Sequence, residues 1–149
     1  MSDKKQILDV QHIHMRFNSK GVCVRAVTDV SFTVDEGETI GIVGESGCGK
    51  TTLGRCIVRA YEPSEGDVMY TAAAGETVNF TKIDKKTMKK YRKEIQMIFQ
   101  DPYSSLDPRM TVYDIIKEPL AANYPKMPKE EMDRRIMDIA AKVGLNTSY

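Results

Sequence analysis

Residues 39–52 read TIGIVGESGCGKTT, an apolar run followed by a glycine-rich loop. The run at 39–43 is short and apolar, which is typical of a strand buried on both faces of a sheet. The loop at 44–51 fits the pattern G-x-x-x-x-G-K-[ST], and residues 51–60 after it have the apolar spacing of a helix. This stretch therefore predicts a strand, a tight loop and a helix in succession, as in an α/β domain.

The residue types of the loop suit a bound phosphate group. Gly44, Gly47 and Gly49 let successive backbone N–H groups face one point, which residues with a Cβ atom do only at a cost. The helix that starts near Lys50 contributes the positive end of its dipole, and the ammonium of Lys50 contributes a full charge. Thr51 offers a hydroxyl to Mg²⁺, which itself bridges phosphate oxygens. A glycine-rich turn before an ordinary helix is the alternative, and we favour nucleotide binding.

The predicted nucleotide contacts cover the whole loop and the residue after it. They are Gly44, Glu45, Ser46, Gly47, Cys48, Gly49, Lys50, Thr51 and Thr52.

Composition excludes several other classes of protein. The chain has 149 residues, of which 41% are hydrophobic and 29% charged, so it can form a core. Its 22 basic and 21 acidic side chains give a net charge of +1, which argues against a nucleic-acid binder. No apolar stretch is long enough to cross a bilayer, and we expect no signal peptide. Cys23, Cys48 and Cys56 lack C-x-x-C spacing and are expected to be free thiols in a reducing cytosol.

The remaining pattern predicts further elements on both sides of the loop. They are strands at 7–17 and 30–34, a turn at 35–38, a hairpin of 68–70 with 78–80, a helix at 85–93, a second buried strand at 95–99, a loop at 101–110, a helix from 112 to 118 that ends at Pro119, and a helix at 129–142. The last helix is expected to present Met132, Ile136, Ile139 and Val143 along one apolar stripe.

Two motifs resemble those of the ATP-binding subunits of ABC transporters. Residues 41–52 contain the first, and residues 95–102, IQMIFQDP, resemble the Q-loop strand of that family. The continuation at 103–112, YSSLDPRMTV, and the segment at 25–32, RAVTDVSF, are similar to the oligopeptide and dipeptide importer branch. The resemblance covers essentially the whole chain.

The resemblance implies ATP and Mg²⁺ as ligands and adds two residues to the site. Lys50 and Gln100 would be the catalytic residues, and Thr51 and Gln100 would contact Mg²⁺. Gln100 would also touch the attacking water and link the nucleotide to the transmembrane partner; a surface glutamine at a strand end is the alternative. Phe17 resembles the aromatic residue that stacks on adenine, and a core phenylalanine is the alternative.

The resemblance also implies the fold, the partners and the location. The fold would be α/β: a P-loop NTPase core sheet, an antiparallel β layer and the start of an ABC helical subdomain. Residues 1–99 would form the ATP-binding core with its β layer, and residues 100–149 the Q-loop and the beginning of the helical subdomain. The partners would be transmembrane permease subunits, a second ABC ATPase subunit (identical or different) and, indirectly, a peptide-binding protein, all at the cytoplasmic face of the cell membrane.

Three further motifs of the family do not occur in these 149 residues. They are a Leu-Ser-Gly-Gly-Gln-type signature, a Walker B strand ending in Asp-Glu, and a switch histidine. We therefore expect the N-terminal half of a longer ATPase, inactive by itself. The alternatives are a soluble ABC ATPase not coupled to transport and a nucleotide-binding fragment that does not hydrolyse ATP. A P-loop kinase would need a lid and an acceptor site, and neither is recognisable.

Overall fold

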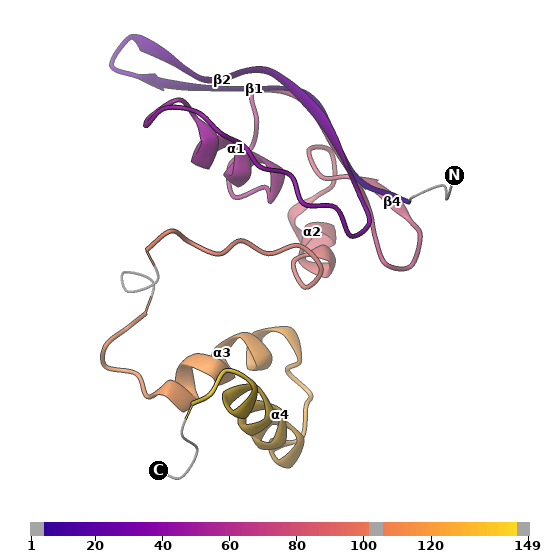
Figure 1. Ribbon diagram of the computed structural model, residues 1–149, viewed down its shortest axis with the longest axis vertical. Coiled ribbons are helices and arrows are strands. Elements are labelled where there is room, and N and C mark those ends of the chain that lie inside the picture. The colour runs from indigo at the N-terminus through magenta and orange to yellow at the C-terminus, as the bar shows by residue number, and fades with distance from the viewer. Residues whose placement is uncertain (1–4, 102–105, 146–149) are drawn as a thin grey trace. The chain divides into compact units, whose positions relative to one another are not determined.

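The computed structural model describes residues 5–101 and 106–145. The chain divides into two compact units, Met1–Met97 and Ile98–Tyr149, which are described separately. The elements of the first unit are β1 (Gln6–Ser19), β2 (Val22–Asp35), α1 (Lys50–Ile57), β3 (Glu65–Thr71), β4 (Thr77–Asn79) and α2 (Lys85–Tyr91) (Figure 1). Those of the second unit are α3 (Val112–Asn123) and α4 (Lys129–Lys142). Whether the units correspond to the predicted domains 1–99 and 100–149 stays a prediction.

The four strands of the first unit form one antiparallel sheet in the order β2-β1-β3-β4. β1 and β2 make a long hairpin whose two-residue turn consists of Lys20 (φ 47) and Gly21 (φ 82). Two positive φ angles give the turn a twist that matches the twist of the strands. The predicted strands at 7–17 and 30–34 are confirmed, and the second begins earlier than predicted, at Val22. The predicted hairpin at 68–80 is also confirmed, as β3 and β4.

The register of the long hairpin shifts at four places, and two opposed bulges in its middle bend it. Val10 pairs with Phe32 but Ile13 pairs with Val30, so β1 has one extra residue there, and β2 has an extra residue a little further on. At these bulges His12 and Asp29 both have a φ of 49, and His12 Nδ1 lies 2.7 Å from Asp29 Oδ1.

The core of the first unit contains buried side chains from the sheet and from both helices. α1 contributes Leu53 and Cys56, and α2 contributes Met88 and Tyr91. Phe80, which follows β4, is fully buried, and its ring centroid lies 5.7 Å from that of Tyr91. The predicted helices at 51–60 and 85–93 are confirmed as α1 and α2, and both end earlier than predicted.

The two predicted buried strands do not form. Residues 39–43 and 95–99 are irregular, with Val43 exposed to 90% and Ile98 to 97%. A strand needs a neighbouring strand to bond its backbone, and none of the four strands in the described residues pairs with either segment. Apolar composition predicted burial, but composition does not supply the partner that burial requires.

In the second unit α3 and α4 pack against each other. The predicted helix end at Pro119 is wrong, because α3 continues through it to Asn123. Proline removes one backbone donor from a helix. The helix beyond it is still held, since the N–H of Tyr124 donates to the carbonyl of Leu120 at 2.8 Å.

The predicted helix at 129–142 is confirmed as α4, but half of its predicted apolar stripe is wrong. Met132 and Ile136 are buried, whereas Ile139 and Val143 are 43% and 66% exposed. The buried positions are four residues apart and end at Ala140. Residues 101 and 106–110 have no helix or strand, as predicted for the loop at 101–110, and residues 102–105 lie outside the described range.

Candidate functional site

The glycine-rich loop leads directly into α1, which begins at Lys50 as the pattern predicts. Gly47 has a φ of 83 and Gly49 a φ of 99, a backbone region that favours glycine. A Cβ atom at Gly49 would lie only 2.0 Å from the carbonyl oxygen of Ala26. Strand β2 therefore passes so close to the end of the loop that no side chain fits between them.

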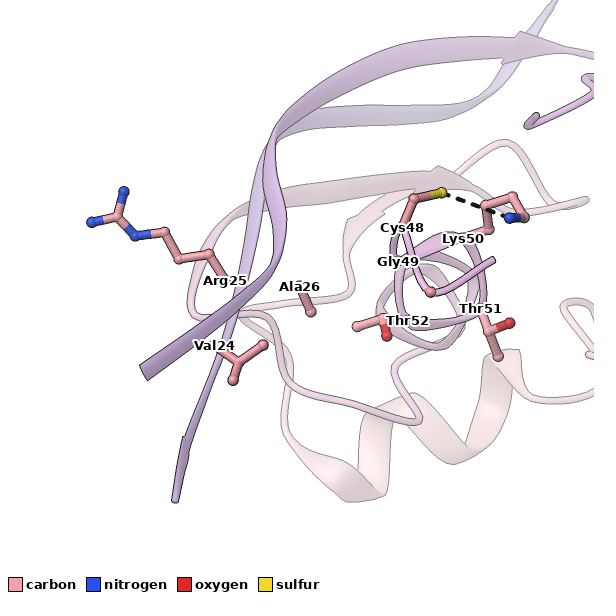
Figure 2. A pocket seen from close by; sticks show the side chains of 9 residues that line it. Val24, Arg25, Ala26, Cys48, Gly49, Lys50, Thr51 and Thr52 are labelled. Atoms are coloured by element: carbon pink, nitrogen blue, oxygen red, sulfur yellow. Dashed lines mark hydrogen bonds between the residues drawn. The ribbon is translucent and has the colours of Figure 1, made fainter. Parts of the chain in front are cut away.

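The ammonium group of Lys50 turns back onto the loop. Its Nζ donates to the carbonyl oxygens of Gly44 at 2.7 Å and Glu45 at 2.6 Å. It also lies 3.6 Å from Cys48 Sγ, the contact drawn in Figure 2. Since Lys50 is half-buried and held by two carbonyl groups, its positive charge is fixed at the loop.

A cavity of about 290 Å³ opens between the loop and β2. Val24, Arg25 and Ala26 line it from β2, while the loop and α1 contribute Gly47, Cys48, Gly49, Lys50, Thr51 and Thr52. Figure 2 shows the Arg25 side chain extending away from Lys50, on the far side of β2 from α1. The volume is at the small end for a ligand pocket, so it suits part of a nucleotide rather than all of it.

The structure brings most of the predicted loop contacts to this cavity. Six of them line it, from Gly47 to Thr52. Gly44 and Glu45 touch the site through the hydrogen bonds that Lys50 donates to them, and Ser46 is exposed. That each residue contacts a nucleotide stays a prediction.

Phe17 lies next to the cavity and is not a core residue. It pairs with Val24 across β1 and β2, so the two side chains share one face of the sheet, and Val24 lines the cavity. Phe17 is 38% exposed and meets Tyr61 edge to face, with ring centroids 5.6 Å apart.

Gln100 lies outside the unit that contains the phosphate loop. It is exposed, lies outside helices and strands, and belongs to the second unit, Ile98–Tyr149. Its contact with Mg²⁺ and water therefore stays a prediction.

Sequence reasoning missed the wall that β2 contributes. The predicted strand at 30–34 did not reach Val24, Arg25 and Ala26, which are far from the loop in the chain. The contact depends on the fold, and the one local signal was Gly49, whose missing side chain indicates a close neighbour but does not identify it.

A family model described as "ABC transporter" matches residues 27–148 of the chain. The chain belongs to the ABC transporter family. Among curated members, the oligopeptide transport ATP-binding protein OppF of Bacillus subtilis is 43% identical over 145 residues, which are 97% of this chain and 46% of that protein. The dipeptide transport ATP-binding protein DppF of Lactococcus lactis is 38% identical over 152 residues, covering 100% of this chain and 47% of that protein. The chain thus spans about half the length of the curated relatives it matches.

Solved ABC cassettes have the same fold. The dimeric post-hydrolysis state of the ATP-binding cassette MJ0796, bound to ADP and Pi, matches with a TM-score of 0.76 and 22% identity, over 95% of this chain and 59% of that one. A second dimeric structure of MJ0796 matches with a TM-score of 0.77 and the same identity, over 95% and 59% of the two chains. The predicted fold class is confirmed as that of the N-terminal part of an ABC ATPase. Among the described residues of this ABC family member, no helix is both long and apolar enough to span a membrane.

Proposed function

We propose that this ABC chain binds MgATP as part of the ATP-binding subunit of an oligopeptide or dipeptide importer. The observation that carries the proposal is the loop at 44–51, which ends in α1 and holds the ammonium of Lys50 against two of its own carbonyl groups. The importer assignment is supported by the names of the relatives, which are oligopeptide and dipeptide transport ATP-binding proteins.

Binding of the phosphates would exchange one set of acceptors for another. The β- and γ-phosphate oxygens replace the carbonyl oxygens of Gly44 and Glu45 as partners of Lys50 Nζ. Backbone N–H groups of the loop and of the first turn of α1 donate to the same oxygens, because these groups have no partner inside the helix.

The residues proposed to hold Mg²⁺ have suitable chemistry. Thr51 is exposed in the first turn of α1, next to the cavity, and it offers a hydroxyl oxygen. Gln100 offers an amide oxygen, and Mg²⁺ prefers such hard oxygen ligands. When bound, the ion neutralises charge on the phosphates, while Lys50 and the loop position them.

The adenine would lie on the β1–β2 side of the cavity. Phe17 presents a half-exposed ring there, and Val24 and Ala26 provide apolar surface beside it. Stacking needs only a flat π-face, which Phe17 supplies.

In the whole importer, the subunit would couple ATP hydrolysis to peptide uptake. Its partners would be transmembrane permease subunits and a second ATPase subunit, with a peptide-binding protein acting indirectly, at the cytoplasmic face of the membrane. A soluble ABC ATPase with no membrane partner is the competing proposal. Co-purification of permease subunits with the protein expressed in its own host separates the two.

The test of nucleotide binding is the substitution Lys50→Ala. We expect it to weaken binding of a fluorescent ATP analogue about ten- to a hundredfold, because the site loses a charge-assisted hydrogen-bond donor to the phosphates. Lys89→Ala, which removes an exposed lysine from α2, is the matched control and is expected to leave the dissociation constant unchanged. Equal dissociation constants for wild type and Lys50→Ala would contradict the proposal.

A further inference from the structure

The segment after α1 is tied to β1 at the position of Phe17. The Ser64 N–H donates to the carbonyl of His14 at 2.8 Å, and the N–H of Arg16 donates to Ser64 Oγ at 3.0 Å. Arg16 also forms an ion pair with Glu65 at 2.7 Å. These bonds fix Ser64 and Glu65, which follow Tyr61, against Arg16, the residue before Phe17.

Tyr61 itself is held by Arg55, a residue of α1. The guanidinium donates to Tyr61 Oη at 2.8 Å and lies 5.3 Å from the centroid of the Tyr61 ring. A backbone hydrogen bond joins the same two residues, because the N–H of Tyr61 donates to the carbonyl of Arg55 at 3.1 Å. The ring of Tyr61 thus has little freedom to turn.

The edge contact of Tyr61 with Phe17 then restricts the second ring. The two ring planes meet at 83°, a favoured geometry for aromatic pairs. On its own, the half-exposed Phe17 could adopt other rotamers, and each misdirected rotamer would reduce stacking with a base. Because α1 begins at the phosphate loop, one helix carries both Lys50 and Arg55.

We propose that Tyr61, held by Arg55, is a positioning residue that orients the ring of Phe17 for stacking on the base of the nucleotide. This inference rests on the proposed function, since it needs a nucleotide at the phosphate loop. The proposed role of Tyr61 affects recognition of the base but not of the phosphates, so the two can be measured separately.

The test compares MgATP with magnesium tripolyphosphate, which has the phosphates but no base, by calorimetric titration of the 149-residue chain. Tyr61→Ala is expected to weaken MgATP binding about three- to tenfold and to leave tripolyphosphate binding unchanged. Tyr61→Phe keeps the edge contact with Phe17 and is expected to restore MgATP binding to within about twofold of wild type.

Two further measurements guard against a purely structural effect. Arg55→Met keeps both aromatic rings but removes the hydrogen bond and the cation–π contact of Arg55 with Tyr61. It is expected to weaken the binding of MgATP but not of tripolyphosphate, by a smaller factor than Tyr61→Ala. The chain has no tryptophan, so Phe17→Trp introduces a single tryptophan, whose emission is read apart from that of the seven tyrosines by excitation at about 295 nm. Its emission is expected to be quenched by MgATP with Tyr61 present, to be quenched less after Tyr61→Ala, and not to respond to tripolyphosphate.

The outcomes separate this inference from the proposed function. If Tyr61→Ala weakens both ligands equally, or neither, Tyr61 does not position the base-stacking ring and the inference is wrong. If the wild-type chain binds neither ligand, the proposed function fails and the inference falls with it.

Discussion

Cys48 is the exposed thiol of the phosphate loop, and its sulfur lies 3.6 Å from Lys50 Nζ. A nucleotide bound at the cavity would cover it. We therefore expect MgATP to slow the alkylation of Cys48 by iodoacetamide, followed by mass spectrometry of the modified peptides.

The other two cysteines are internal controls for this experiment. Cys23 is exposed but does not line the cavity, so MgATP should leave its alkylation rate unchanged. Cys56 is buried, and burial raises the pKa of its thiol, so it should react slowly with or without nucleotide. Protection of Cys48 no greater than that of Cys23 would show that the loop does not hold the nucleotide as proposed.

Gly49 is a position where a single methyl group should disrupt the site. Gly49→Ala would place a Cβ atom 2.0 Å from the carbonyl oxygen of Ala26, at a φ of +99. Gly75→Ala is the matched control, because its φ is +87 but its Cβ atom would meet nothing within 4 Å.

The two variants separate backbone strain from the steric clash. Gly75→Ala should lower the free energy of unfolding by about 1–2 kcal/mol through strain alone. Gly49→Ala should lower it by at least about 2 kcal/mol more, because β2 must move away from the loop. Urea denaturation followed by circular dichroism measures both, and equal losses would mean that β2 does not press against Gly49.

At this scale the sequence predicted the chemistry of the site but not its surroundings. The residues of the loop from Gly44 to Thr51 are adjacent in sequence, and their chemistry by itself predicts phosphate binding. The contacts of Gly49 with Ala26 and of Phe17 with Tyr61 join segments distant in the chain, so they depend on the fold.

Among the elements, the β3–β4 hairpin contains an aspartate with a strongly lowered pKa. Asp67 on β3 accepts hydrogen bonds from Asn79 Nδ2 at 2.9 Å, Thr81 Oγ1 at 2.8 Å and Lys82 Nζ at 2.9 Å. These donors, that of Asn79 most of all, lower the pKa of its carboxyl group to about 2. The carboxylate therefore fixes β4 and the residues after it to β3.

This arrangement predicts a pH-dependent contribution to stability. The pKa of Asp67 is lower in the folded state than the usual value of about 4, so its stabilisation is present above pH 4 and is lost as the pH falls toward 2. Asp67→Asn should lower the free energy of unfolding at pH 7 by about 1 kcal/mol, after allowance for partial exposure, and by progressively less between pH 4 and pH 2.

Urea denaturation at several pH values tests this prediction. Asp9→Asn is a suitable control, because Asp9 lies on neighbouring β1 and accepts a single side-chain bond from Gln11. A stability difference between wild type and Asp67→Asn that does not change with pH would contradict the role assigned to the ionised carboxyl group.

Elements were predictable where their stabilising contacts are close in sequence. The helices α1, α2 and α4 and the β3–β4 hairpin agree with the apolar spacing and turn residues, whereas the sequence predicted β1 and part of β2 but not the hairpin that joins them. The segments at 39–43 and 95–99 have the composition of buried strands but no strand pairs with them in the described residues. Their case shows that β structure depends on the neighbouring strand, whereas a helix such as α3 satisfies its own backbone and continues even through Pro119.

At the scale of the whole molecule, we expect the chain to bind MgATP without hydrolysing it. The 149 residues supply a loop, a lysine and a hydroxyl for the phosphates, but none of the recognised family motifs that provide a general base. Loss of a general base lowers rates by about 10²- to 10⁴-fold.

We therefore expect no phosphate release from the purified chain at saturating MgATP above a Lys50→Ala blank. Turnover near one per second, which is about the rate of competent phosphoryl-transfer enzymes, would mean that these residues contain a catalytic base.

The helix α1 has a consequence for insertions and deletions. Lys50 and Arg55 are at fixed positions on one eight-residue helix, which turns by about 100° and advances about 1.5 Å per residue. One residue added between them would turn Arg55, together with Tyr61 that bonds to it, by about 100° relative to Lys50 and the loop. Length changes elsewhere in the first unit, such as in the β1–β2 turn, would leave this alignment unaltered. The chain should therefore tolerate a longer hairpin far better than a longer α1.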